Sequence, residues 1–414
     1  MSSHAILSPS SAGRWTKCPG SLWISKDEVD QATDYAQEGT TAHALAELCL
    51  KSGAKAESMI GQYISSDSNI PVDDEMVKKV QEYVDSINKA KNSIKEILDF
   101  EVERKLDFTH LLNLSEGTEK LDLLNSPINA FGTADVIIVG DNQLQVHDLK
   151  YGKGVRVDAE DNTQMLIYAL AAYSVYSLCF PIHEISMHIH QPRLNHYSEA
   201  KVSPEDLYKF GEFLKDKALR AYKIYLEGPE SEEDFLVGES QCRFCKGSGK
   251  CEALSKHASQ ALDRDFKNLD EGIKDSVSDL NLNDLSAKYK AIPLIEIWIA
   301  AISKRVFETL EQGGVVEGFK LVQGPLGKRT WKDANAAEAL LKSFRLKKDE
   351  IYKTAIISPT QAKELVKNCQ KRIDKIEEIT IRSEGKPIVR PSSDKRPPID
   401  IGIEFKDLTQ EENK

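Results

Sequence analysis

The order of the predicted elements indicates an α/β fold for this chain of 414 residues, with a core of the order helix, strand, strand, strand, helix, strand. The first observation is a hairpin, because the strand-like runs 131–139 and 144–149 are separated by Gly140-Asp141-Asn142, a tight-turn sequence. The second is the largely apolar helical segment 162–180, which the strand-like run 185–191 follows. Further helical segments on both sides of this core predict helical insertions.

The elements before the hairpin are predicted from capping residues and periodicity. Ser8 and Pro9 mark the start of a helix, with serine as the N-cap and proline at the first helical position. Apolar residues recur at helical spacing over 40–50, and Gly53 follows as a C-terminal glycine. A third helix begins at Asp73-Asp74 and continues towards residue 97, where the alternating run 97–108 predicts the first strand.

The C-terminal third is expected to be a separate, mostly helical α+β domain. A helix over about 203–226 follows the core, and a cysteine-rich loop comes next. Beyond Asp263 the composition becomes helical and lysine-rich, with a small strand unit expected at 318–331. We therefore expect a first domain over residues 1–265 and an accessory domain over 266–414.

Charge is segregated along the chain. The net charge of -11, from 55 Lys and Arg against 66 Asp and Glu, argues against a protein that coats nucleic acid by bulk electrostatics. The stretch from Lys320 to Asp400 differs, because its 19 Lys and Arg exceed its 11 Asp and Glu by 8. We expect this basic domain to bind the phosphates of a nucleic acid, with Trp331 or Phe344 stacking on a base. A solvated lysine-rich surface is the alternative.

Composition also bears on the compartment. The N-terminus has neither a basic nor an apolar segment, so no secretion signal is expected. The longest largely apolar stretch, 165–180, is interrupted by tyrosine and serine, which is typical of a buried helix rather than a membrane span. Seven cysteines, an odd number, favour metal or cluster ligation over a disulfide framework. We expect a cytoplasmic protein with no membrane partner.

The strongest chemical signal is a pair of aspartates and a lysine on the hairpin. Asp135 lies on the first strand of the hairpin, and Asp148 and Lys150 lie at the end of the second. Antiparallel pairing brings the two carboxylates together, where oxygen ligands suit Mg²⁺ or Mn²⁺. Lys150 shares a face with Asp148, so it can orient a metal-bound water and stabilise charge on a phosphate. A strand end whose charges lie in water is the alternative.

Three polar residues on helices add to this pattern. His43 lies within the 40–50 helix, where it is either an ordinary helix histidine or a ligand for Mn²⁺, Fe²⁺ or zinc. Gln164 and Tyr168 lie at i and i+4 of the long helix and share a face. A tyrosine there is ordinarily part of the core, whereas a buried glutamine needs hydrogen-bond partners.

Together these motifs resemble the RecB-type branch of the PD-(D/E)xK nuclease superfamily over about residues 8–255. The matching motifs, in chain order on helix, strand, strand and helix, are Gly39-x-x-x-His43, Gly132-x-x-Asp135, Asp148-x-Lys150 and Gln164-x-x-x-Tyr168. The chain departs from many relatives in having Asp148 where they have glutamate, and Ala134 replaces the proline of the name. The resemblance implies a restriction-endonuclease-like core.

The resemblance also implies roles for these residues. His43, Asp135, Asp148 and the backbone carbonyl of Leu149 would hold the metal. Lys150 would act on the attacking water, and Gln164 and Tyr168 would support the site or the DNA.

The cysteines point to a second inorganic site. Cys242, Cys245 and Cys251 place three thiols on a glycine-rich loop, and Cys18, before Pro19, is the best candidate for the fourth ligand that a zinc site or a cubane cluster needs. This arrangement resembles the iron–sulfur clasp of AddB-type helicase-nucleases and of the CRISPR adaptation nucleases, which joins the ends of the nuclease domain. We expect a [4Fe–4S] cluster rather than zinc, because a zinc ribbon usually has two C-x₂-C knuckles and only one is present.

Over its whole length the chain also resembles a family of phage and prophage proteins of unknown function, whose context suggests replication or recombination. The expected activity is that of a metal-dependent DNA nuclease, an exonuclease acting at ends, which hydrolyses phosphodiester bonds. The chain has no G-x-x-x-x-G-K-[ST] motif, so unwinding would require a partner. Expected partners are DNA and a phage single-strand-binding or annealing protein, polymerase or helicase.

Two alternatives belong to other classes. One is a catalytically inactive iron–sulfur protein that serves as a DNA-binding or replication scaffold, against which the intact Asp135, Asp148 and Lys150 argue. The other is a zinc-stabilised enzyme such as a deaminase, but the sequence has no H-x-E motif with P-C-x-x-C.

Overall fold

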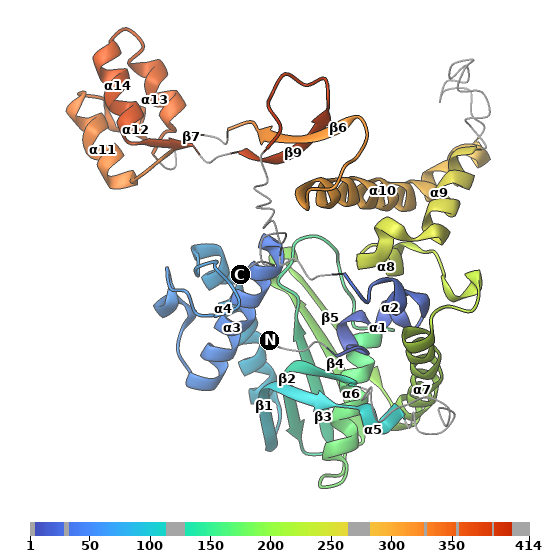
Figure 1. The fold of residues 1–414 in the computed structure, drawn as a ribbon. Coiled ribbons are helices and arrows are strands. Elements are labelled where there is room, and N and C mark those ends of the chain that lie inside the picture. Colours follow the sequence, from blue (N-terminus) through green and yellow to red (C-terminus); the bar gives the residue numbers. More distant parts are fainter. Residues whose placement is uncertain are drawn as a thin grey trace, which may run out of the picture. The chain divides into compact units, whose positions relative to one another are not determined.

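The computed structural model describes residues 5–28, 33–112, 129–263, 282–326, 329–352, 356–382 and 385–399 (Figure 1). The chain divides into two compact units, Met1–Trp298 and Ile299–Lys414. The boundary that the sequence predicts between residues 265 and 266 lies outside the described residues.

The first unit contains a five-stranded mixed sheet in the order β1-β2-β3-β4-β5. Its strands are β1 (Ile97–Asp107), β2 (Phe131–Gly140), β3 (Gln143–Leu149), β4 (Glu184–Gln191) and β5 (His196–Val202). β3 and β4 are parallel, and the other neighbouring pairs are antiparallel. The helix α6 (Thr163–Tyr176) lies in the crossover that two parallel strands require. With α4 (Asp74–Ser93) before β1, the chain has the predicted α-β-β-β-α-β order, and the α/β fold class with helical insertions is confirmed.

β5 is absent from the sequence prediction. It follows the turn η3 (Pro192–Leu194) and Asn195, whose φ of 49° places that residue in the left-handed region. Partly buried and exposed residues alternate along β5. An edge strand pairs on one side only and buries little apolar area, so its hydrophobic pattern is weak.

Helices cover both faces of the sheet, and β2 contributes to two apolar cores (Figure 1). One core joins α6 and α7 (Pro204–Glu227) to residues that include Ile137 and Val139. The other joins α3 (Asp34–Ser52) and α4 to residues that include Val136 and Ile138. Because both of its faces are buried, β2 has a nearly continuous apolar sequence.

The ends of the helices follow the predicted capping signals. The Asp73 carboxylate caps α4 by accepting a hydrogen bond from the Met76 N–H at 2.7 Å. α3 begins earlier than expected, because the hydroxyl group of Thr33 caps it. It ends before Gly53, whose φ of 74° suits a C-terminal glycine. The remaining short elements of this unit are η1 (Pro9–Ser11), α1 (Ala12–Trp15), α2 (Gly20–Ile24), η2 (Ala56–Met59), α5 (Thr109–Leu112), η4 (Glu232–Asp234), α8 (Glu239–Cys242), η5 (Lys246–Lys250) and α9 (Glu252–Asp263).

The division between the units falls within α10 (Leu282–Glu311). In the second unit, β6 (Phe319–Gly324) pairs with β9 (Gly385–Pro391), and β7 (Arg329–Trp331) pairs with β8 (Thr380–Arg382). Its helices are α11 (Ala334–Ser343), α12 (Lys348–Ile351), α13 (Pro359–Leu365) and α14 (Gln370–Glu378). None of the described helices in either unit is long and apolar enough to cross a bilayer.

Two aromatic residues of the second unit serve its core. Phe344 is only 7% exposed and belongs to a cluster with Leu341 and Ile376, so the expectation that it stacks on a base is wrong. Trp331 packs against the same cluster, and its indole N–H donates to the carbonyl oxygen of Ile357 at 2.7 Å. Neither ring is therefore presented as an open stacking surface.

Candidate functional site

The ends of β2 and β3 form the centre of the candidate site. The ladder between these strands ends at the pair Val136 and His147, so the next residues, Asp135 and Asp148, lie where the strands separate. Oδ2 of Asp135 accepts a hydrogen bond from the Leu149 N–H at 2.6 Å and so bridges the two strands. Both aspartates are buried, which rules out the alternative of a strand end with its charges in water.

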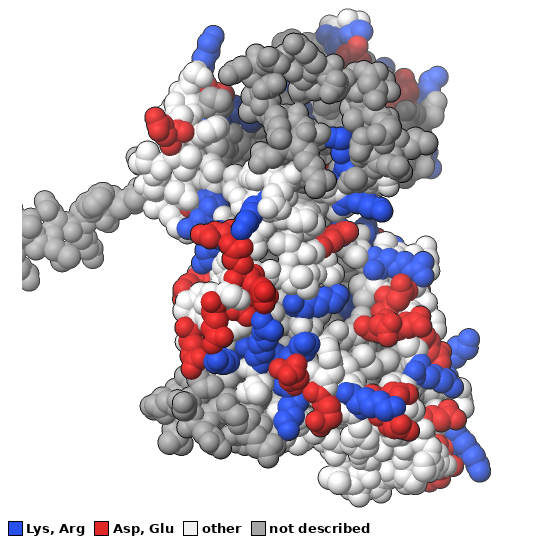
Figure 2. All heavy atoms as spheres, turned by 90° about the vertical axis from the view of Figure 1, so that its right-hand side faces the viewer, with Lys and Arg blue, Asp and Glu red and all other residues white. Residues whose placement is uncertain are grey.

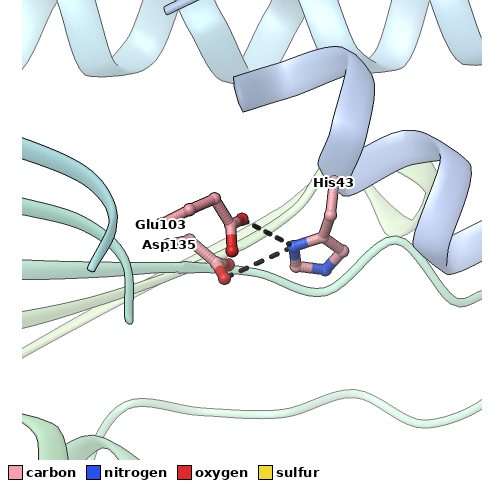
Figure 3. A group of neighbouring side chains, drawn as sticks. All are labelled: His43, Glu103 and Asp135. Carbon is pink, nitrogen blue, oxygen red and sulfur yellow. Dashed lines mark ion pairs between the residues drawn. The ribbon is translucent and has the colours of Figure 1, made fainter. Parts of the chain in front are cut away.

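His43 and a glutamate that the sequence analysis missed complete a compact group with Asp135 (Figure 3). Nδ1 of His43, on α3, lies 3.3 Å from Oδ1 of Asp135 and 3.7 Å from Oε1 of Glu103 on β1. Among the described residues, this is the only group of three or more histidine, cysteine or acidic side chains whose ligand atoms all lie within 4.8 Å of one another. One third of the His43 side chain is exposed, so the group is open to a ligand from solvent.

Glu103 occupies an unusual position on β1. Its neighbours Val102 and Arg104 pair with Val136 and Ala134, so Glu103 lies opposite Asp135. Its φ of 54° falls in the left-handed region, which costs a residue other than glycine about 1–3 kcal/mol. In sequence, Glu103 is one of many charged residues in an alternating strand, and only the register of β1 against β2 distinguishes it.

A second cluster adjoins the first on the α6 side of the sheet. Lys150 Nζ donates to Oδ1 of Asp148 at 3.1 Å and to Oε1 of Gln164 at 2.9 Å. Nε2 of Gln164 donates to the same Asp148 oxygen at 3.2 Å and lies 3.5 Å from the Tyr168 hydroxyl group. Gln164 lies in the first turn of α6, which Asn162 caps. The structure therefore brings together Asp148, Lys150, Gln164 and Tyr168.

The two aspartates differ in their tendency to ionise. Burial raises the pKa of Asp148, and the Asp135 charge adds to that shift, while Lys150 opposes it. Burial would also raise the pKa of Asp135, but His43, the Leu149 N–H and Lys150 hold it below its ordinary value. Burial and the Asp135 charge raise the pKa of Glu103. Three carboxyl groups thus share a site in which any added negative charge is unfavourable and a cation is favourable.

His43 is coupled to the same acids. Burial would lower its pKa, but the nearby Asp135 and Glu103 carboxylates raise it well above the ordinary value. The protonated imidazole supplies the carboxylates with the positive charge that a bound metal ion would supply in its place.

The donor set fits a hard divalent cation. Carboxylate oxygens with one imidazole nitrogen suit Mg²⁺ or Mn²⁺. Oδ2 of Asp148 is buried without a hydrogen bond, although it lies 2.9 Å from Lys150 Nζ. Of the four predicted ligands, the structure groups His43 and Asp135 directly, with Glu103 as the third member, while Asp148 faces Lys150. Leu149 contributes its N–H to Asp135.

The four predicted cluster cysteines line one cavity. Cys18 follows α1, Cys242 ends α8, and Cys245 and Cys251 flank η5. The packing of η5 depends on Gly247, because a Cβ atom there would lie 2.7 Å from the backbone oxygen of Ile24. The other lining residues are Ser21, Ile24, Phe235, Leu236, Val237, Gln241, Ser248 and Leu254.

Three of the thiols in this cavity, those of Cys18, Cys242 and Cys251, resist ionisation. Burial raises the pKa of Cys18 to about 12, and the other three cysteines add to the shift, although a backbone hydrogen bond from Leu236 opposes it. Burial likewise raises the pKa of Cys242 and of Cys251. A cationic centre would be needed to hold these groups as thiolates.

Comparison with known proteins gives a family and similar solved structures, one of which is described below. The family described as "Protein of unknown function (DUF2800)" matches residues 4–397. A solved structure titled "Crystal structure of SSO0001" is similar at 13% sequence identity over 51% of this chain and 85% of that chain, with a TM-score of 0.23.

Proposed function

This chain belongs to the DUF2800 family, and from its site we propose that it is a divalent-metal-dependent DNA nuclease that hydrolyses phosphodiester bonds. The observation that carries the proposal is the meeting of Asp135, Asp148 and Lys150 at the separating ends of β2 and β3, with His43 beside them. Two buried carboxylates and a lysine, open to solvent on the His43 side, are the groups that phosphodiester hydrolysis needs.

Each residue has a distinct role in this proposal. His43, Glu103 and Asp135 would hold Mg²⁺ or Mn²⁺, with Asp148 as a further oxygen donor. The bound cation would lower the pKa of a water molecule and offset charge on the phosphate. Lys150 holds its ammonium group within 3.1 Å of Asp148, where it can orient that water. Gln164 keeps Lys150 in place through its 2.9 Å hydrogen bond.

DNA as substrate is supported by the resemblance to RecB-type PD-(D/E)xK nucleases and by the loop after Lys150. Residues 152–156 of this loop are exposed and include Lys153 and Arg156, whose ion pairs with Glu75 and Asp158 lie at the surface, where phosphates can compete for them. The face that carries α7, shown in Figure 2, has interspersed acidic and basic side chains and lies away from the residues of the proposed site, which come from α3, β1, β2, β3 and α6. Examples are the ion pairs of Lys223 with Glu230 and of Lys256 with Glu232. We place the DNA on the His43 side, and expect an exonuclease that acts at ends in phage replication or recombination in the host cytoplasm.

The cysteine cavity supports a [4Fe–4S] cluster over zinc. Zn–S bonds of about 2.3 Å in a tetrahedron would place the sulfurs about 3.8 Å apart. No three of Cys18, Cys242, Cys245 and Cys251, all within the described part of the chain, have sulfurs within 4.8 Å of one another. A cubane is larger and accepts a wider spacing. Anaerobically purified protein should contain iron and labile sulfide and absorb visible light. Protein that contains zinc alone would contradict the cluster.

The nuclease proposal is tested by cleavage of end-labelled single- and double-stranded DNA in Mg²⁺ or Mn²⁺. Asp148→Asn and Lys150→Ala should each reduce the rate by at least about 100-fold, because each removes a group that acts in the transition state. Asp141→Asn, at the exposed turn at the other end of the hairpin, is the matched control and should cleave normally. Wild-type rates in both site variants would refute the assignment. DNA binding without any cleavage would favour the scaffold alternative.

A further inference from the structure

The helix α14 of the second unit carries basic side chains along one side. Lys371, Arg372 and Lys375 are all exposed, and their spacing of three and four residues places them on neighbouring positions of the helix surface. A different side of the helix packs into the core of the unit through Ile373 and Ile376. The three charges are therefore held in a fixed arrangement by the packing of α14.

The acidic residues of α14 lie along another side and are already engaged. Asp374 accepts a hydrogen bond from the Gln370 side chain at 2.8 Å. Glu377 forms ion pairs with Arg329 on β7 and with Lys363 on α13. The acidic side of the helix thus faces other elements of its own unit. Among the residues that the structure describes, the three basic side chains of α14 form no ion pair and keep their charge for a ligand.

A second basic segment adjoins α14. The guanidinium group of Arg372 lies over the Phe344 ring, 5.4 Å from the ring centre. Arg345 and Lys347, which follow Phe344 in the connection between α11 and α12, are both exposed. Leu346 between them packs against the core to which Phe344 belongs. We call the five basic residues of the two segments the basic patch: Arg345, Lys347, Lys371, Arg372 and Lys375.

The backbone at Arg345 adds an independent observation. Its φ of 61° falls in the left-handed region. Arg345 directly follows Phe344, which ends α11, and glycine is the usual residue at this position. The conformation is unfavourable for a residue with a Cβ atom, so an arginine here gives up stability for an exposed charge. A ligand that needs this charge accounts for the exchange.

We propose that the basic patch binds the phosphate backbone of DNA without reading its bases. Lysine and arginine side chains gathered from two segments are the groups that contact phosphates. The rings of Phe344 and Trp331 serve the core, so they do not add base stacking to these contacts. The choice of DNA among polyanions rests on the proposed function, whereas the patch itself needs neither the metal nor the cysteine site.

The test measures binding of the full-length protein to a fluorescein-labelled DNA duplex at several KCl concentrations. EDTA is present, so metal-dependent cleavage does not interfere. Lys371→Gln combined with Lys375→Gln removes two charges of the patch. The matched control is Lys342→Gln combined with Lys367→Gln, because these exposed lysines of the same unit are each paired with a glutamate.

The patch variant should bind the duplex more weakly than wild type. Each lost phosphate contact should also make the dependence of log affinity on log salt shallower by about 1, which gives about 2 for the pair. The control loses the same net charge and should keep the wild-type slope. An equal change of slope in both variants would overturn the proposal, because net charge alone would then explain it.

Arg345→Gly separates binding from folding. Glycine adopts the left-handed conformation freely, so this variant should melt at the same temperature as wild type or higher, yet its salt slope should be shallower by about 1. Wild-type affinity and slope in this variant and in the lysine pair would overturn the proposal and leave the nuclease assignment intact. Failure of the wild-type protein to bind the duplex would also overturn it. A failure of cleavage alone would refute only the proposed function, because the binding assay contains no metal.

Discussion

Lowering the pH from 7 to 4.5 should destabilise the first unit, because three buried histidines remain neutral in its folded sheet. His147, His188 and His190 lie on the neighbouring strands β3 and β4 and are each at most 5% exposed. Burial lowers the pKa of His188 to about 4 and that of His190 to about 3. Burial, together with the two other histidines, lowers the pKa of His147 well below its ordinary value.

The sign and size of the effect follow from these shifts. An unfolded histidine takes up its proton as the pH falls through about 6.5, whereas folded His188 does so only near its pKa of about 4. The contribution of a neutral buried histidine to the free energy of unfolding is therefore complete above about pH 6.5 and decreases as the pH falls below that value. For His188 alone, the loss between pH 7 and 4.5 is about 2–3 kcal/mol. The Glu199 carboxylate, 3.9 Å from Nδ1 of His188, opposes this shift, and Lys201 adds to it.

Native-state hydrogen exchange of peptides from β3 and β4 measures this loss strand by strand. His188→Gln is the comparison, because glutamine can still bond to the hydroxyl groups of Ser186 and Tyr197, which lie 2.8 and 2.7 Å from the two ring nitrogens. In this variant, the pH dependence of the opening free energy should be shallower by up to about 1.4 kcal/mol per pH unit, the value of one proton. Asp148 and Glu103 contribute the opposite slope to both proteins, because their raised pKa values let the folded state bind protons. Equal slopes for the two proteins would refute the reasoning.

Three further predictions concern single residues. Cys18→Ser should lose iron and labile sulfide and unfold at a lower temperature, whereas Cys179→Ser, whose thiol is exposed outside the cavity, should lose neither; equal iron content in both would contradict the ligand assignment. Gly247→Ala should destabilise the protein by about 1–3 kcal/mol, because the added Cβ atom would lie 2.7 Å from the backbone oxygen of Ile24. An unchanged midpoint of urea denaturation would count against this packing. Gly39→Ala should stabilise α3 by about 0.5–1 kcal/mol, since a Cβ there meets nothing within 4 Å. If the open surface one turn before His43 admits DNA, the same variant should cleave more slowly, and an unchanged rate would exclude that role for Gly39.

Two parts of the molecule determine whether this protein can act as proposed: the group of His43, Glu103 and Asp135, and the cysteine cavity. Metal affinity tests the first part, and thermal stability tests the second. The proposed metal ligands lie on α3, β1 and β2, so metal affinity should report the packing of α3 against the sheet. The cysteine cavity joins the connection after α1 to the segment around η5, more than 200 residues later. A link of that length restricts the unfolded chain strongly. Loss of the proposed cluster should therefore affect stability before it affects chemistry.

The amino-acid sequence by itself determined the features that depend on near neighbours. The turn at Gly140-Asp141-Asn142 sets the hairpin, and its short span brings Asp135 and Asp148 to one end without any information from the rest of the chain. Strand alternation places Lys150 with Asp148, and helical spacing places Gln164 with Tyr168. The caps at Asp73 and Ser203 likewise act within one helical turn.

Only the tertiary structure decided the contacts between distant segments. Glu103 joins His43 and Asp135 because β1 pairs with β2 in one register, and a strand sequence with charges at many positions does not specify that register. The buried histidines of β3 and β4 are neighbours because those strands are parallel, which depends on the crossover through α6. Phe344 is a core residue because short helices of the second unit close around it. In each case the deciding free energy comes from the burial of segments far apart in sequence, which no local pattern encodes.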